Sequence, residues 1–454
     1  MTDLGQHFDT AKLLRYTLPV MGMLLLSSAY GIVDGLFVSN FAGKTAFASV
    51  TITMPFVMIL STVGMMMGSG GSALVGRLLG AGREHEANGV FSLITWTTLA
   101  VGVVTAVLGV AFMEPVVRLL GADEAMVPPA SAYGRIAFLS MPMFMLQYTL
   151  EVFSATSGKP QLGLYSAAVA GVVNIGLDAL FLAVFGWGVV GAATATAMAE
   201  YASAGLLIAL FFRGKAGSLR LGRPSGGWRV LAGAAYNGVS EMVGSMAASV
   251  VAVAYNLQLM AYFGEVGVAA YGVIEYISML FGAMLGGYVE GSAPLMSYQH
   301  GARNDAEKRS LLAHGIAIVS AGGLGMLVLS QLLAYPLACV FTGYDAELLV
   351  LTERAFRIYS VAFAFMGFTM LGSSVFTALG NGTVSAVIAF VHTGLFEIGS
   401  VLLLPPLLGP ESIWWAITVA EVAATALTAA LLAAYGPRYG LLASKGMFDK
   451  GEAS

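Results

Sequence analysis

The segment GGSALVGRLLGAGREHE at Gly70–Glu86 recurs half a chain later as GSAPLMSYQHGARNDAE at Gly291–Glu307. Aligned at an offset of 221 residues, the two segments share Gly, Leu, Ala and Glu positions without a gap. The same offset places Glu200 on Glu421, and an offset of 222 places an Arg-Ile pair of the first half, at Arg135, on a second pair at Arg357. Chance matching of abundant Gly and Ala does not explain the paired Arg and Glu residues. The chain is therefore interpreted as two similar halves.

The composition is that of a membrane protein. Of the 454 residues, 58% are hydrophobic and 10% are charged, and the mean hydropathy is +0.82. A soluble domain has about 45–50% apolar and about 25% charged residues. These values exclude a soluble enzyme and a disordered protein, and the net charge of −4 gives no basic surface for nucleic acid. The single cysteine, Cys339, excludes an intramolecular disulfide and a metal site with several cysteines.

Twelve apolar runs are long enough to span a bilayer, which takes about 20 residues of helix. They are Leu18–Phe41, Ser49–Val75, Gly89–Phe112, Ala130–Ala155, Leu162–Phe185, Val190–Phe212, Leu231–Phe263, Val268–Met296, Leu311–Leu333, Ala355–Leu379, Thr383–Leu408 and Ile413–Tyr435. The runs are continuous, whereas barrel strands alternate apolar and polar residues. The sequence predicts an all-α integral membrane protein with twelve transmembrane helices in two six-helix lobes related by a parallel internal repeat.

The distribution of Lys and Arg predicts the orientation. With the N-terminus in the cytoplasm, 16 of the 21 cationic residues fall in inner segments, five of them in Arg213–Arg229. The positive-inside rule then places both termini in the cytoplasm of a multi-pass cell (inner) membrane protein. The expected domains are an N-lobe at 1–212, a cytoplasmic loop at 213–230, a C-lobe at 231–435 and a cytoplasmic tail at 436–454. A parallel repeat places the substrate site between the lobes.

Polar residues inside the spans of the first half predict an ion site. Asp34 lies in the first span, Asn174 and Asp178 lie four residues apart on one face of the fifth, and Thr196 lies in the sixth. All four are expected in the outer half of the membrane, where their oxygen atoms suit a small cation or a proton. The alternative is that each polar group only bonds a neighbouring helix.

Other acids inside spans leave two interpretations open. Glu151 in the fourth span is expected deeper toward the inside, either as a coupling residue or in a hydrogen bond between helices. Glu241 and Glu290 are expected near span ends, where a side chain is solvated or reaches to the interface. His392 is expected to pack and form a hydrogen bond, with proton transfer as the alternative.

Methionine and aromatic residues are candidates for an adaptable substrate cavity, with ordinary helix packing as the alternative. The candidates are Met143, Tyr148, Tyr255 and Tyr271, together with the acid Glu275.

Several motifs resemble the multidrug and toxic compound extrusion (MATE) family, most of all its bacterial and archaeal branch with a cation site in the N-lobe. They are Leu18-Pro19, DGLFV at Asp34–Val38, GRLLGAG at Gly76–Gly82, NIGLD at Asn174–Asp178, GWGVVGAA at Gly186–Ala193 and PLMSYQHGA at Pro294–Ala302. The resemblance covers residues 12–435. It implies a V-shaped cavity open to one side at a time and export of organic, often cationic, compounds in exchange for H⁺ or Na⁺.

The resemblance also implies roles for individual residues. Asp34, Asn174, Asp178 and Thr196 match the family's N-lobe cation positions, with Na⁺ a candidate ligand of the first three. Glu151 departs from the family, which commonly has Asn near this position. We expect no cofactor, no structural metal, no nucleic-acid partner and a monomer that contacts only small organic substrates and membrane lipid.

Three alternatives remain at the level of sequence. A flippase for lipid-linked precursors would share the two-lobed fold, but such flippases tend to have a strongly basic cavity. An intramembrane hydrolase would use paired acids such as Asp34 and Asp178, yet no nucleophile and base accompany them. A channel is the third alternative. The expected protein is a transporter and not an enzyme.

Overall fold

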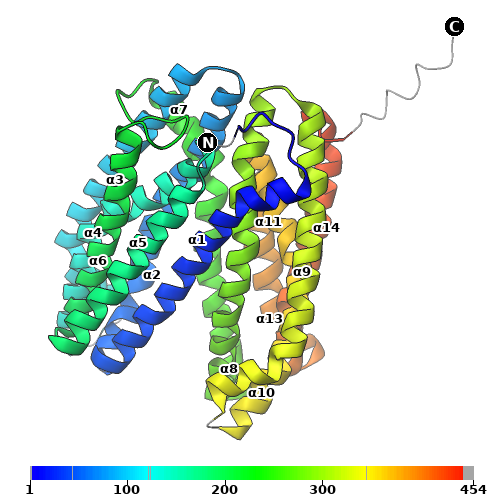
Figure 1. Cartoon of the computed structure of the whole chain (residues 1–454). Coiled ribbons are helices and arrows are strands. Elements are labelled where there is room, and N and C mark those ends of the chain that lie inside the picture. Colours follow the sequence, from blue (N-terminus) through cyan, green and yellow to red (C-terminus); the bar gives the residue numbers. More distant parts are fainter. Residues whose placement is uncertain (1–2, 43, 121, 123, 344, 443–454) are drawn as a thin grey trace.

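A computed structural model of the chain describes residues 3–42, 44–120, 122, 124–343 and 345–442, and it gives no side-chain placement for 44–48 and 51. Every regular element in these residues is a helix. The helices form two bundles, one from each half of the chain, which touch at one end of the molecule and diverge toward the other (Figure 1). The predicted all-helical, two-lobed fold is confirmed.

The N-lobe contains six long helices, two of which continue into a π-helical stretch. They are α1 (Thr10–Phe37) with a π stretch at Val38–Ala42, α2 (Lys44–Gly80), α3 (Glu84–Leu119), α4 (Val127–Thr156), α5 (Gln161–Asp178) with a π stretch at Ala179–Val184, and α6 (Gly188–Phe212).

The C-lobe has the same number of crossings, with more interruptions. They are formed by α8 (Val239–Gly301), α9 (Asp305–Thr342), α10 (Ala346–Tyr359) joined by a 3-10 turn at Ser360–Ala362 to α11 (Phe363–Ala378), α12 (Gly382–Ala389) joined by a π stretch at Phe390–Glu397 to α13 (Ile398–Leu408), and α14 (Ala416–Tyr435) between 3-10 turns at Pro410–Trp415 and Gly436–Tyr439.

The helix α8 accounts for two of the twelve spans. In the described residues, 11 helical segments are long and apolar enough to cross a membrane, and α8 alone has 63 residues. At 1.5 Å per residue, α8 is about three times as long as the hydrocarbon core is thick, which is about 30 Å. Gly264, with φ of 63°, breaks the helix in its middle. A positive φ is easy for Gly because it has no Cβ. The chain therefore crosses twice, before and after Gly264.

The expected seventh span, Leu231–Phe263, begins too early. Residues Trp228–Asn237 form a separate helix, α7, which ends at Gly238 before α8 begins. Leu231 and Ala234 of α7 pack in a hydrophobic cluster with residues of α2 and α3, so this part of the chain lies against the N-lobe. The preceding loop is also bound there, because the N–H of Arg220 donates to Asn88 Oδ1 at 2.6 Å. The loop between the lobes is thus attached to the N-lobe along its length.

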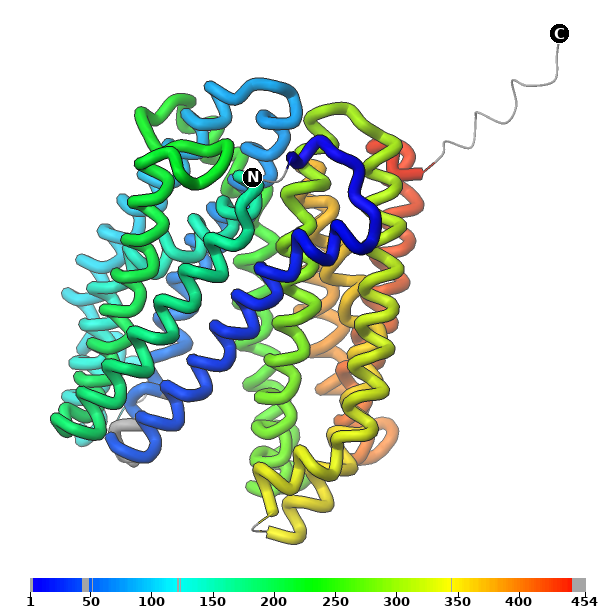
Figure 2. Tube along the Cα trace, in the orientation of Figure 1, coloured from blue at the N-terminus to red at the C-terminus, as the bar shows by residue number. Residues whose placement is uncertain are grey.

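The segments that the sequence predicts on one side of the membrane gather at one end of the molecule. Gln299 Nε2 donates to the carbonyl of Leu4 at 2.9 Å, and Lys308 Nζ donates to the carbonyl of Tyr439 at 2.5 Å. The N-terminal segment and α7 lie at this same end (Figures 1 and 2). This agrees with helices that cross alternately. Of the expected tail at 436–454, residues 443–454 lie outside the described residues.

The lobes touch at this end through glycine. A Cβ added to Gly80 of α2 would overlap the carbonyl oxygen of Tyr298 in α8, and one added to Gly301 would overlap the carbonyl oxygen of Arg77. Such backbone contact is possible only where side chains are absent, as in membrane helix pairs that pack through small residues. The two glycines belong to the repeated segments Gly70–Glu86 and Gly291–Glu307, so both copies of the repeat build the contact.

Candidate functional site: an acid pair in the N-lobe and two acidic cavities

The predicted N-lobe ion site lies where two helices change their winding. Asp34 is near the end of α1, just before the π stretch Val38–Ala42. Asp178 is the last residue of α5 and is followed directly by the π stretch Ala179–Val184. A π-helical turn leaves backbone and side chains out of the usual helical register, and such turns are frequent at functional sites.

The structure brings the four predicted residues together. The carboxyl group of Asp34 lies close to the side chains of Asp178 and Asn174. Asn174 Nδ2 donates to Thr196 Oγ1 at 3.3 Å, which links α5 to α6. Asn174 and Asp178 are 1% and 0% exposed. The i, i+4 spacing in α5 and the packing of α1 against α5 thus produce one compact polar group.

This group has acceptors in excess of donors. Asp34 Oδ1 and both carboxylate oxygens of Asp178 are buried and have no protein hydrogen-bond donor in the described part of the chain. Two adjacent carboxylates in a low-dielectric site are stable only when they share a proton or hold a cation. No set of three or more His, Cys, Asp or Glu residues suited to a metal exists among the described residues. The oxygen-rich pair suits a proton or Na⁺.

Glu151 belongs to a different network. It is 8% exposed, and its Oε1 accepts from Gln147 Nε2 and from Ser166 Oγ, both at 3.1 Å. Ser166 in turn pairs with Ser203 of α6 at 2.5 Å. Glu151 therefore joins α4, α5 and α6 through satisfied hydrogen bonds, and none of these bonds includes Asp34 or Asp178.

Glu200 is an acid that the sequence analysis did not select as a site residue. It lines a small cavity of about 50 Å³ together with Thr196, Tyr133 and Ser140. Its Oε2 is buried without a hydrogen-bond partner in the described residues. Two signals pointed to it: Glu200 follows Thr196 by one helical turn, and Glu421 is its counterpart in the repeat.

The C-lobe contains a wider cavity, of about 590 Å³. It is lined by Tyr271, Glu275, Tyr359 and Glu397, and Tyr359 donates its hydroxyl to Glu275 Oε1 at 3.2 Å. Tyr255 stacks on Tyr271 with 4.6 Å between ring centres, but it is 0% exposed and packs in the hydrophobic core. Of the predicted cavity residues, Tyr271 and Glu275 therefore line this cavity, whereas Tyr255 packs behind Tyr271 and does not line it.

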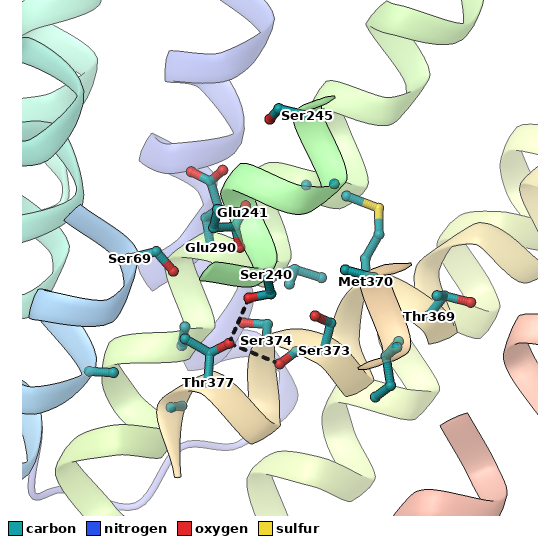
Figure 3. A pocket seen from close by; sticks show the side chains of 18 of the residues that line it. Ser69, Ser240, Glu241, Ser245, Glu290, Thr369, Met370, Ser373, Ser374 and Thr377 are labelled. Atoms are coloured by element: carbon teal, nitrogen blue, oxygen red, sulfur yellow. Dashed lines mark hydrogen bonds between the residues drawn. The ribbon is translucent and has the colours of Figure 1, made fainter. Parts of the chain in front are cut away.

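A further cavity, of about 370 Å³, lies between the lobes (Figure 3). Ser69 of α2 and Tyr148 of α4 line it from the N-lobe, and Glu241 and Glu290 of α8 line it from the C-lobe. Glu241 lies in the first turn of α8, near a span end as expected, and both acids face this cavity between helices. Met143 lines none of the three cavities described here.

His392 also lines the cavity between the lobes, and it lies in the π stretch of the C-lobe. Its Nε2 is 3.2 Å from Glu421 Oε1, and Thr369 donates to the other oxygen of Glu421 at 3.3 Å. His392 is therefore packed at ion-pair distance from an acid of α14, and its Nδ1 lies 3.5 Å from Thr393 Oγ1.

Comparison with known proteins identifies the family. A sequence profile of the MatE family matches residues 19–180 and, a second time, residues 242–401. The chain belongs to the MatE family. The two matches fall in the two halves of the chain, as the repeat predicts, and the MATE resemblance is confirmed. The protein is accordingly a multi-pass membrane transporter.

Relatives of known description agree with this family. The multidrug export protein MepA of Staphylococcus aureus (strain MSSA476) is 24% identical over 416 residues, which are 90% of each chain. MepA of Staphylococcus saprophyticus is 26% identical over 413 residues, again 90% of each chain.

Solved structures share the fold. An outward-facing multidrug resistance MATE transporter of the MOP superfamily has a TM-score of 0.89 and 21% identity over 95% of this chain and 97% of its own. A MOP superfamily transporter from Pyrococcus furiosus, described as having a binding pocket of reverse polarity that suggests a different function, has a TM-score of 0.87 and 21% identity over the same shares.

Proposed function

We propose that this protein is a secondary active multidrug exporter that exchanges organic, often cationic, compounds for inward H⁺ or Na⁺ by alternating access. The observation that carries the proposal is the pair Asp34 and Asp178, because three of its four carboxylate oxygens are buried and have no hydrogen-bond donor among the described residues. Such a pair needs a proton or a cation to remain in the membrane interior. The MepA relatives, described as multidrug export proteins, support the direction of transport.

The charge of the cavities supports cationic cargo. Glu241 and Glu290 line the cavity between the lobes, Glu275 and Glu397 line the C-lobe cavity, and neither lining contains a Lys or an Arg. An acidic wall attracts organic cations and repels the phosphate groups of lipid-linked precursors. This favours an exporter over a flippase of the same fold.

The exchange follows from competition between ion and cargo. An ion that enters from the open end neutralises Asp34 and Asp178, and the π stretches beside them are the elements that can rewind when the charge changes. Because the acid pair is then neutral, the protein attracts a cationic cargo less strongly. By linkage, the cargo lowers the affinity for the ion by the same factor. No covalent step is involved, so the protein is proposed to be a transporter without enzymatic activity, cofactor or structural metal.

The decisive experiment is efflux of a cationic dye from proteoliposomes, with a pH gradient and a Na⁺ gradient imposed separately. We expect uphill efflux with one of the two gradients and none when both are collapsed. Efflux at the same rate without any gradient would contradict an antiporter and indicate a channel.

The orientation has its own test. We propose that the end where the lobes touch is cytoplasmic, so that the described conformation is open to the outside. In a Cys339→Ser background, a Lys215→Cys variant places a thiol in the exposed loop beside α6. An impermeant maleimide should label it only after the cells are permeabilised. Labelling in intact cells would reverse the topology.

A further inference from the structure

The polar part of the lining of the cavity between the lobes consists mainly of hydroxyl and carboxylate groups, set among apolar residues such as Val152, Val289 and Ile388. Ser240, Ser373, Ser374 and Thr377 line one side of it, from α8 and α11 (Figure 3). Three of these hydroxyls are hydrogen-bonded to one another or to Ser385: Thr377 pairs with Ser385 at 2.7 Å, Ser373 pairs with Ser385 at 2.8 Å, and Ser240 pairs with Thr377 at 3.4 Å. A hydroxyl has one hydrogen but two lone pairs, so a network that uses the hydrogens internally still offers acceptor oxygens.

Two carboxylates complete the acceptor wall. Glu241 and Glu290 lie on opposite sides of the Gly264 bend in α8 and face the same cavity (Figure 3). Glu290 Oε1 is 3.4 Å from the hydroxyl of Tyr148, and Glu290 Oε2 is buried without a partner in the described residues. Besides the two acids, the titratable side chains of the lining are Tyr148 and His392. The Nε2 atom of His392 lies 3.2 Å from Glu421 Oε1. No residue of the lining neutralises the two acids.

The size of this cavity indicates a molecule and not a bare ion. A volume of about 370 Å³ is far above the roughly 30 Å³ that one water occupies and falls within the range of about 300–1,000 Å³ for small-molecule sites. A ligand must then bring positive charge and several donors together. Planar amidinium and guanidinium groups do so, because they present parallel N–H groups to a carboxylate.

We propose that this cavity is a subsite selective for cations that carry N–H donors, with Glu290 as the principal contact and Glu241 as the second. The proposal rests on the exporter function proposed above and assigns a cargo class to one of its cavities. The C-lobe cavity differs, because Tyr271, Tyr276 and Tyr359 give it aromatic walls. Aromatic faces attract cations that have no N–H, such as quaternary ammonium groups. The two cavities thus divide the cargo by the chemistry of its charged group.

Binding of two matched probes tests the proposal. Benzamidinium carries four N–H groups, and benzyltrimethylammonium has similar size and charge but none. Their dissociation constants are measured by calorimetry on the full chain in lipid nanodiscs. We expect Glu290→Gln to weaken benzamidinium binding by about tenfold or more, because a charge-assisted bond is lost, and to change benzyltrimethylammonium binding by less than about twofold. Glu275→Gln in the C-lobe cavity should give the opposite pattern.

Two further variants keep the test conclusive. Glu114→Gln is the matched control, because Glu114 is exposed and pairs with Arg118 at 3.3 Å outside the cavities; both probes should bind it as they bind the parent protein. Tyr148→Phe removes the hydroxyl next to Glu290 and should weaken benzamidinium by a smaller factor, about threefold. Should Glu290→Gln fail to fold, as judged by gel filtration, Glu241→Gln and Tyr148→Phe carry the same comparison.

The outcomes separate this proposal from the exporter function. Equal weakening of both probes by Glu290→Gln would show a site without N–H selectivity, and unchanged benzamidinium binding would place the amidinium elsewhere. Either result overturns the proposal while gradient-driven efflux in the parent protein persists. Loss of gradient dependence in the parent protein would instead overturn the exporter function, whatever the probes bind.

Discussion

The two lobes repeat one arrangement of helices but place their acids in different surroundings. In the N-lobe, Asp34 and Asp178 lie close together, and three of their four carboxylate oxygens are buried without a hydrogen-bond partner in the described residues. In the C-lobe, Glu275 accepts from Tyr359 and faces a cavity of about 590 Å³. The first site is a buried pair of acids, and the second lines a cavity with room for a molecule.

The two lobes share an irregular helix. In each half, the fifth crossing contains a π stretch, Ala179–Val184 in one and Phe390–Glu397 in the other. The first directly follows Asp178, and the second contains His392 and ends at Glu397. The duplication therefore kept a π stretch in the same crossing, although at a different point along it, while the side chains around it diverged. We interpret this as one scaffold that separates ion binding from cargo binding.

The largest expected effect comes from removing the N-lobe charge. Asp34→Asn keeps the shape of the side chain and should abolish uphill efflux, because the site then no longer needs a proton or cation. Asp178→Asn should do nearly the same. Efflux from proteoliposomes against a concentration gradient measures both, with Glu114→Gln as the control. If the two Asn variants pump at the parent rate, coupling lies elsewhere, and Glu241, Glu275 and Glu290 become the candidates.

An intermediate effect is expected in the C-lobe. Glu275→Gln should raise the KM for a quaternary ammonium cargo by about tenfold, since an attractive charge at an aromatic site contributes about 1–2 kcal/mol. The dependence of the rate on the driving gradient should stay as in the parent protein. Initial efflux rates over a range of cargo and gradient strengths separate the two quantities. A changed gradient dependence with an unchanged KM would mean that the C-lobe acid binds the ion.

The contact that joins the lobes predicts an effect on conformation. Gly301→Ala places a methyl group against the carbonyl of Arg77, and such overlap costs about 1–3 kcal/mol in a packed interface. The lobes should then open at this end more often. Gly282→Ala, also in α8 but with nothing within 4 Å of the added carbon, is the control. Distances between spin labels on the two lobes report the shift, and equal distributions in both variants would show that the glycine contact does not hold the lobes.

The smallest effect is expected at Glu151. Its Oε1 already accepts two hydrogen bonds and does not contact the acid pair. Glu151→Gln keeps the size and one carbonyl acceptor, so efflux should change by less than about threefold, with a loss of stability of about 1 kcal/mol. Dye efflux and thermal unfolding in detergent measure the two. Complete loss of uphill transport would assign Glu151 to the coupling site, as one interpretation of the sequence allowed.

The sequence by itself was enough to predict the membrane class, the helical fold, the repeat and the residues of the acid pair. Hydrophobic runs and lysine and arginine counts depend only on composition along the chain. The meeting of Asn174 and Asp178 follows from helical periodicity, and the depth of Asp34 follows from its place in a span. These properties are local, so they can be predicted without knowing how the helices pack.

Tertiary structure alone decided which distant side chains meet. Glu241 and Glu290 were expected near span ends, and only the fold shows that the bend at Gly264 brings both acids to one cavity between the lobes. Tyr255 was expected in a cavity and is buried behind Tyr271, while Glu151 bonds Gln147 and Ser166. The direction in which a helix presents each side chain depends on its rotation against neighbours far away in sequence, and that rotation is determined by packing across the whole bundle.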